Sequence, residues 1–93
     1  MKEETLREEK PLLADGFDKA ILGLSRGSLS ILRDNVVVYS VEKCIDILAK
    51  DMTYEEAVEY FEFNVLGAYM GPMTPIFVHE MDVEGINEYA DTM

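Results

Sequence analysis

Three glutamates in the second half of the chain stand at spacings that could support acid–base chemistry. Glu55, Glu59 and Glu62 are four and three residues apart, so a helix would place them on one face. Two carboxylates held in a pocket can split their pKa values and serve as general acid and general base. A glycosidase built on such a pair needs a larger cleft than 93 residues can frame. The spacing therefore indicates an exposed acidic face.

The chain has one cysteine and one histidine, Cys44 and His79. Nucleophilic catalysis would need the imidazole beside the thiol, and no local motif supports that pairing. Cys44 falls on the apolar positions of a predicted helix, where burial raises the pKa of a thiol and leaves it inert. Transition-metal sites recruit several His or Cys ligands, and the acids after His79 lack the spacing of a calcium loop. We therefore expect no catalytic residue, no metal site and no cofactor.

Residues 25–28, with the sequence SRGS, form a short loop that could hold an anion. The loop has neither of the glycine-rich motifs that bind phosphate, so a plain turn is the simpler interpretation. The alternative function for the protein depends on this region. In that alternative, an anionic nucleotide or metabolite would bind near Arg26, Ser28 and Arg33.

Charge is distributed unevenly along the chain, whose net charge is −11. The eight Lys and Arg residues all lie within residues 1–50, whereas residues 51–93 contain ten Asp or Glu and no Lys or Arg. Such a surface repels nucleic acid and anionic membranes and attracts basic proteins. The alternative is that the acids only keep a small protein in solution.

Aromatic residues accompany the acids of residues 54–69 in greater number than one helix face can bury. Tyrosine and phenylalanine among polar groups are typical of protein interfaces, where they act as hot spots. We therefore predict a partner-binding surface, for a basic protein or for a second copy of the chain. Its residues are Glu55, Glu59, Glu62, Tyr60 and Phe63.

The elements that must position these residues follow from apolar patterns. Strands are predicted at residues 20–24, 28–31, 36–39 and 74–78. The first of these should be buried on both faces, with a short helix as the alternative, and Gly23 inside it indicates a bulge or a close backbone approach. Helices are predicted after Ser40, a helix-capping residue, and after Thr53, which forms a capping box with Glu56. This order predicts an α+β fold, with a mostly antiparallel sheet of three to four strands and a two-helix hairpin packed on one face.

The chain is short enough that we expect a single domain over residues 1–93. Residues 1–12 are predicted to form an exposed charged arm, and residues 13–79 the core. Residues 80–93 are acidic and show no regular apolar period, so no helix or strand is predicted there. No apolar run reaches the ~18 residues of a membrane span. The N-terminus lacks the apolar centre of a signal peptide, which favours a cytoplasmic protein.

Four segments of the chain resemble small proteins encoded by tailed bacteriophages and prophages. They are GFDKAILGL, VVYSVEKCIDIL, DMTYEEAVEYFEFNVLGAYMG and TPIFV, and the region they span, residues 16–78, is about two-thirds of the sequence. The resemblance implies a phage setting and action in the host cytoplasm, and it supplies no catalytic residue or substrate. Together with the charge pattern, it leads us to expect a non-catalytic interaction module that inhibits a basic host protein.

Overall fold

The structure is a computed structural model that describes residues 10–26, 35–68 and 70–92. The described residues form three strands, β1 (Ile21–Leu24), β2 (Val37–Ser40) and β3 (Ile76–Val78). They also form three α-helices, α1 (Val41–Leu48), α2 (Tyr54–Tyr60) and α3 (Val83–Asp91). A 3₁₀ turn, η2 (Asp18–Ala20), precedes β1, and a π-helix, η3 (Phe61–Leu66), continues α2. The predicted α+β class is confirmed.

The three strands lie in the order β1-β2-β3, and the sheet is mixed. β1 pairs with β2 in the antiparallel sense, whereas β2 and β3 are parallel. The parallel pair arises because α1, α2 and η3 form one long crossover between the two strands. The prediction of a mostly antiparallel sheet is corrected accordingly. The strand predicted at residues 28–31 lies outside the described residues.

β1 forms one edge of the sheet and contains the bulge predicted at Gly23. The register with β2 shifts between Ile21 and Gly23, and Gly23 has a φ of +150°, which favours glycine. The prediction that this strand is buried on both faces is wrong. Ile21, Leu22 and Leu24 are all exposed, and no residue of β1 belongs to the buried core.

Both predicted helix caps are present. The Ser40 hydroxyl accepts a hydrogen bond from the Lys43 amide at 3.1 Å and begins α1. At the start of α2, the Thr53 hydroxyl accepts from the Glu56 amide at 3.1 Å. The Glu56 carboxylate in turn accepts from the Thr53 amide at 3.0 Å, which completes the capping box.

An aromatic cluster joins the sheet to the helices. Tyr39 of β2 stacks on Phe77 of β3 with ring centroids 5.4 Å apart, and Phe61 of η3 meets Phe77 edge-on at 5.3 Å. Tyr39 is fully buried, and its hydroxyl accepts a hydrogen bond from the Ala14 amide at 2.6 Å. β2, β3, η3 and the segment before β1 therefore share one core. Its other buried members are Phe17, Ala20, Val37, Val41, Cys44, Ile45 and Ala57.

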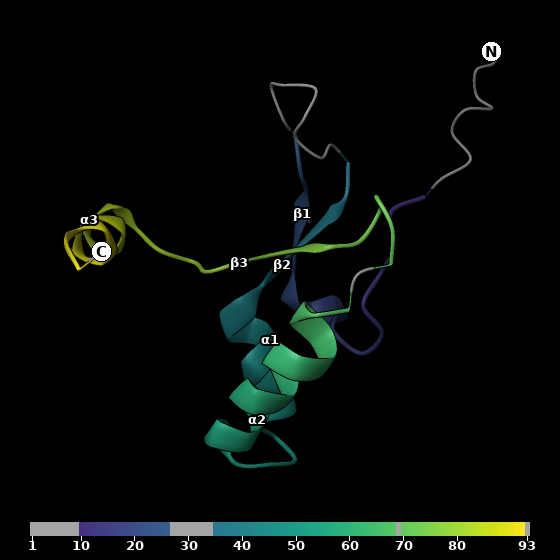
Figure 1. The fold of residues 1–93 in the computed structure, drawn as a ribbon, viewed down its shortest axis with the longest axis horizontal. Coiled ribbons are helices and arrows are strands. Elements are labelled where there is room, and N and C mark those ends of the chain that lie inside the picture. Colours follow the sequence, from purple (N-terminus) through teal and green to yellow (C-terminus); the bar gives the residue numbers. More distant parts are fainter. Residues whose placement is uncertain (1–9, 27–34, 69, 93) are drawn as a thin grey trace.

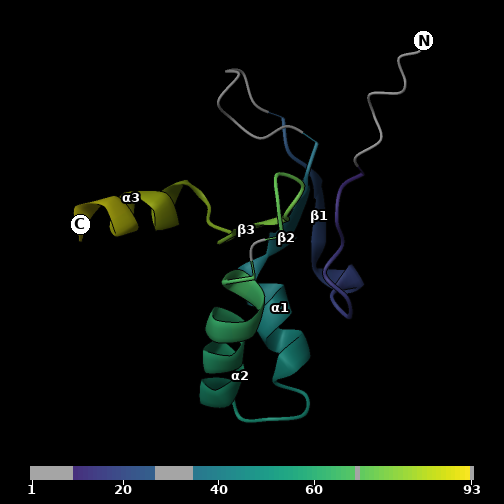
Figure 2. The same ribbon diagram turned by 45° about the vertical axis from the view of Figure 1, so that its right-hand side comes forward.

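The two-helix hairpin continues from the end of β2, where α1 begins. Figures 1 and 2 show α1 and α2 side by side beyond one end of the strands, and η3 returns toward the sheet. Packing of this hairpin across one face of the sheet is not confirmed.

α3 is a helix that the sequence pattern did not predict. Its cap is Asp82, whose carboxylate accepts a hydrogen bond from the Gly85 amide at 2.8 Å. None of its residues is buried, and both ribbon views show α3 set apart from the other elements. Gly85 in the first turn obscures the apolar spacing of three, which runs through Val83, Ile86 and Tyr89.

Candidate protein-binding surface

The five residues predicted to bind a partner lie along α2 and η3, and all five are exposed. Among them, Phe63 keeps 76% of its surface accessible, and Tyr60 keeps 45%. Phe61, two residues from Phe63, is 2% exposed because it packs on Phe77. Tyr60 and Phe63 are therefore aromatic groups that the fold leaves largely outside the core.

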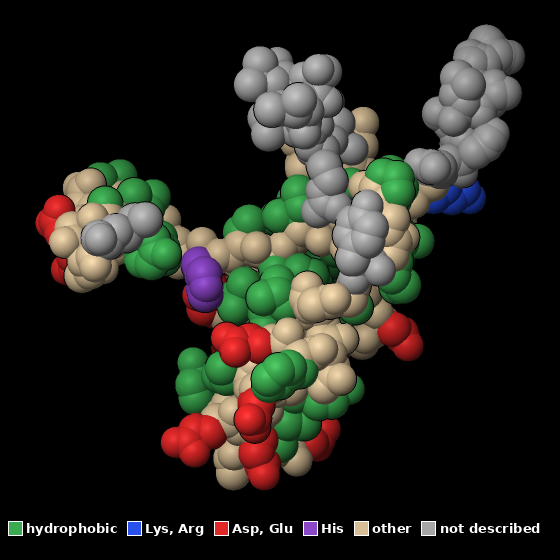
Figure 3. All heavy atoms as spheres, viewed as in Figure 1, with side chains coloured by type: hydrophobic (Ala, Val, Ile, Leu, Met, Phe, Trp, Pro, Cys, Tyr) green, Lys and Arg blue, Asp and Glu red, His purple; other side chains and the backbone are tan. Residues whose placement is uncertain are grey.

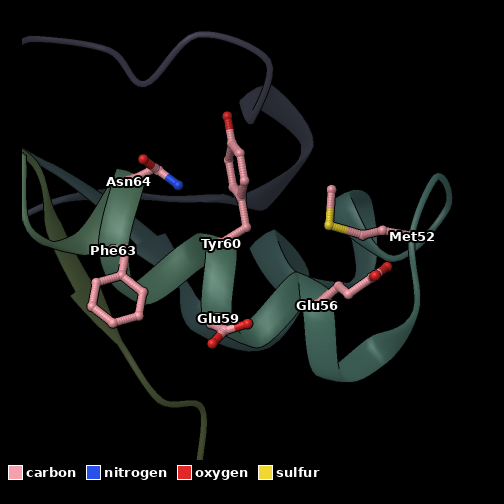
Figure 4. Close-up of a pocket in the computed structure, with 6 residues that line it drawn as sticks. All are labelled: Met52, Glu56, Glu59, Tyr60, Phe63 and Asn64. Carbon is pink, nitrogen blue, oxygen red and sulfur yellow. The ribbon is translucent and has the colours of Figure 1, made fainter.

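An open pocket of about 360 Å³ lies on this surface. It brings Glu59, Tyr60 and Phe63 together, whereas Glu55 and Glu62 are not among its lining residues. In Figure 4, Tyr60 and Phe63 leave the helix in different directions, and Glu59 lies beside Phe63. The residues around the pocket are Met52, Glu56, Glu59, Tyr60, Phe63 and Asn64.

Met52, Glu56 and Asn64 are pocket residues that the sequence analysis did not assign to the surface. With Tyr60 they stand at intervals of four, which is the spacing of side chains stacked on one helix face. Glu59 and Phe63 form a second row at the same interval. The helical spacing of Glu56, Tyr60 and Asn64 was therefore a signal in the sequence for one wall of the pocket, whereas Met52 comes from the link before the helix.

The second aromatic group, Phe63, lies in η3 directly after α2. In a π-helix each backbone N–H pairs five residues back, so successive side chains turn through a smaller angle than in an α-helix. Phe61 begins η3 and enters the core, and Phe63 follows on the solvent side. Short π segments inside helices occur frequently at functional sites.

The surface around the pocket is acidic. In Figure 3, Asp and Glu groups gather with apolar groups over the end of the molecule formed by the hairpin, and no Lys or Arg is visible there. Glu55 and Glu56 occupy the first turn of α2, where the positive end of the helix dipole stabilises carboxylates. An apolar, aromatic pocket within acidic surroundings suits a basic partner that also offers an apolar group.

A polar network at the end of β3 attaches the chain to the start of α1. The Glu42 carboxylate accepts from Nδ1–H of His79 at 2.7 Å and from the Glu80 amide at 3.0 Å. Lys43 Nζ lies 3.7 Å from Glu80 Oε2. Partial burial acts to raise the pKa of Glu42, but these hydrogen bonds outweigh it and hold the pKa below its ordinary value of 4.5.

Cys44 lies in the core with no accessible surface, and burial raises the pKa of its thiol to about 11. The thiol is therefore protonated at neutral pH. His79 forms its hydrogen bond with Glu42 at the protein surface. No group of three or more His, Cys, Asp or Glu residues that could hold a metal ion occurs in residues 10–26, 35–68 and 70–92.

The alternative anion site cannot be built from the described residues alone. Arg26 is exposed at the end of the β1–β2 hairpin, while Ser28 and Arg33 lie outside the described residues. The hairpin continues past β1 through hydrogen bonds from the Ser25 amide to the Val36 carbonyl at 2.9 Å and from the Asn35 amide to the Ser25 carbonyl at 2.8 Å. Anion binding in this loop stays a prediction.

No protein-family model, no curated protein and no solved structure matches the chain. Within the described part of the chain, no helix is both long and apolar enough to cross a membrane.

Proposed function

We propose that the protein is a non-catalytic interaction module that binds a basic protein through the pocket surface of α2 and η3. The observation that carries this proposal is the exposure of Phe63, at 76%, beside Glu59 and Tyr60 in an acidic pocket. A phenylalanine left in water gives up the free energy of burying its ring. Binding of a partner over Phe63 recovers that energy.

Aromatic and acidic groups would have different roles in the complex. Phe63 and Tyr60 would be the buried centre, where a few aromatic side chains supply most of the binding energy. Glu55, Glu59 and Glu62 would lie toward the rim. Charges at an interface rim mainly speed the encounter and select partners of opposite charge, and they add less to the affinity itself.

The partner that we propose is a basic nucleic-acid-binding protein of a bacterial host. Two features support this choice: the lack of Lys and Arg in residues 51–93, and the sequence resemblance to proteins of tailed phages. An acidic face can occupy a surface that evolved to bind phosphates, because both present negative charge to Lys and Arg. The outcome would be inhibition of the host protein in the host cytoplasm.

The experiment compares Phe63→Ala with Tyr54→Ala as immobilised baits in a bacterial lysate. Tyr54 is a matched control because it is 64% exposed on the same helix and does not line the pocket. We expect wild type and Tyr54→Ala to retain the same basic protein. Phe63→Ala should retain at least tenfold less of it, as is typical of a hot-spot aromatic. Equal retention by all three baits, or no retained basic protein, would contradict the proposal.

A further inference from the structure

α3 presents an apolar stripe that nothing in the described chain covers. Val83, Ile86 and Tyr89 are 73%, 54% and 58% exposed. At 100° per residue these three side chains lie on one side of the helix, and Glu84, Glu88 and Asp91 lie on the opposite side. A nine-residue helix is marginal in water by itself and is normally stabilised by packing of its apolar face. The stripe therefore calls for a packing surface.

The base of α3 is fixed to the body of the protein. His79 and Glu80 are both bound to Glu42 at the start of α1, so only Met81 and Asp82 separate this anchor from the helix. In Figures 1 and 2, α3 lies on one side of the molecule and the segment before β1 lies on the opposite side. With so short a connection, α3 cannot reach that opposite side of its own chain.

An apolar groove is present on that opposite side. It has a volume of about 330 Å³ and lies between residues 12–17, the end of η3 and the loop before β3. Asp15 is the one charged residue among the twelve that line it, and Leu13 and Met70 on its walls are 61% and 64% exposed. Its volume is about twice that of a ~150 Å³ cavity that accommodates benzene, so it has room for more than one apolar side chain.

We propose that the groove receives α3 of a second copy of the chain, in a reciprocal dimer with twofold symmetry. Three stripe side chains bury about 100 Å² each. The groove would lose about as much surface as the side chains that cover it, so one contact would bury about 600 Å² and two contacts about 1,200 Å², which is the lower end of the range for stable interfaces. A one-way contact would bury half as much, which favours the reciprocal arrangement. The acids of α3 stay in solvent because they lie opposite the stripe.

Salt dependence separates this contact from the binding of a basic partner. Two chains of net charge −11 repel each other, so added salt should strengthen a dimer held by apolar contacts. Binding of a basic protein to the α2–η3 surface should weaken under the same change. The groove and the α2–η3 pocket share Tyr60 and Asn64, so the two contacts would compete, but neither proposal rests on the other and either can fail alone.

The test is sedimentation equilibrium of the full chain from 10 to 500 µM, at about 50 and 500 mM NaCl. Wild type should form a dimer whose dissociation constant falls as salt rises. Ile86→Asp should raise that constant at least tenfold, and so should Leu13→Asp in the groove. The matched control is Asn87→Asp, which adds one negative charge, as Ile86→Asp does, at an exposed residue outside the stripe. It should dimerise as wild type does, apart from the small repulsion caused by the added charge. Circular dichroism should show that all variants are folded.

Three results would overturn the proposal. The first is a monomer at every concentration and salt. The second is a dimer that Ile86→Asp and Leu13→Asp leave unchanged, because the interface would then lie elsewhere. The third is a dimer that weakens as salt rises, because opposite charges would then hold it.

Discussion

Removal of one hydroxyl, in Tyr39→Phe, should test how the segment before β1 is held against the sheet. Tyr39 is fully buried, and its hydroxyl is the acceptor of the Ala14 amide at 2.6 Å. The substitution keeps the ring and its stacking on Phe77 but removes that acceptor. An amide left without its partner costs about 1–3 kcal/mol. Because Ala14 is only half-buried, water can reach it in part, and we expect a loss of about 1–2 kcal/mol.

For a domain of this size, such a loss lowers the melting temperature by roughly 5–15 °C. Thermal unfolding followed by circular dichroism measures it directly. Tyr54→Phe is the control, because the Tyr54 side chain is 64% exposed and should tolerate the change within about 0.5 kcal/mol. Equal melting temperatures for wild type and Tyr39→Phe would refute the idea that this hydrogen bond anchors the wall of the groove.

Three further predictions concern stability and reactivity. Thr53→Ala should lower the free energy of unfolding by about 1 kcal/mol, because α2 loses the hydroxyl that accepts from the Glu56 amide; an unchanged urea midpoint would contradict this. Cys44 should react with a thiol reagent at pH 8 far more slowly in the folded protein than in urea. Its pKa of about 11 leaves roughly one thiol in a thousand ionised in the folded protein. A fast reaction of the folded protein would be inconsistent with burial of the thiol. The pKa of Glu42 is lower in the folded state, so the stability that its carboxylate adds is present above pH 4.5 and is lost as pH falls through the lowered value. Glu42→Gln should therefore make the free energy of unfolding less sensitive to pH in this acid range, by a few tenths of a kcal/mol after solvent screening. Urea unfolding at several pH values measures this, and an unchanged sensitivity would argue against the network.

Local signals in the sequence predicted the elements that have strong local causes. Ser40 and Thr53 mark helix starts because a hydroxyl satisfies a backbone amide that has no partner in the first turn. The bulge follows from Gly23 inside an apolar run, since glycine tolerates the positive φ. Pro75, which has no backbone N–H to donate, immediately precedes the edge strand β3, as proline at the start of a strand normally does.

Features set by distant parts of the chain could not be predicted in the same way. Whether β3 runs parallel or antiparallel to β2 depends on the path of the crossover between them, and the residues Ile76–Val78 carry no pattern that indicates this path. Burial of β1 depends on what covers the two faces of the sheet, which the apolar run at Leu22 and Leu24 does not show, and both side chains are exposed. α3 was overlooked because Gly85 weakens its helical pattern, and its stripe meets no core.

The candidate surface was predicted in part. Exposure of Tyr60 and Phe63 follows from an excess of aromatic residues over what one helix face can bury. The pocket itself depends on Met52, which comes from the link between the two helices, and on the turn to η3. Only the folded chain brings the link, α2 and η3 together around the pocket.

The claim that the acids of α2 and η3 serve binding is tested most directly by association rates. The variant is Glu55→Lys, Glu59→Lys and Glu62→Lys combined, in which three changes of two charges move the net charge from −11 to −5. The control, Glu84→Lys, Glu88→Lys and Asp91→Lys, makes the same change on α3. Both should fold, because exposed substitutions cost little, and Glu55→Lys adds a few tenths of a kcal/mol by opposing the helix dipole.

Association of each form with the basic protein retained by the wild-type bait is measured at about 50 and 300 mM salt, between which the Debye length falls from about 14 to about 6 Å. We predict that wild type binds fastest at low salt, and that the α2–η3 variant binds at least tenfold more slowly and loses most of its salt dependence. The α3 control should keep most of both. Equal rates and equal salt slopes for wild type and the α2–η3 variant would show that the acidic surface only keeps the protein in solution.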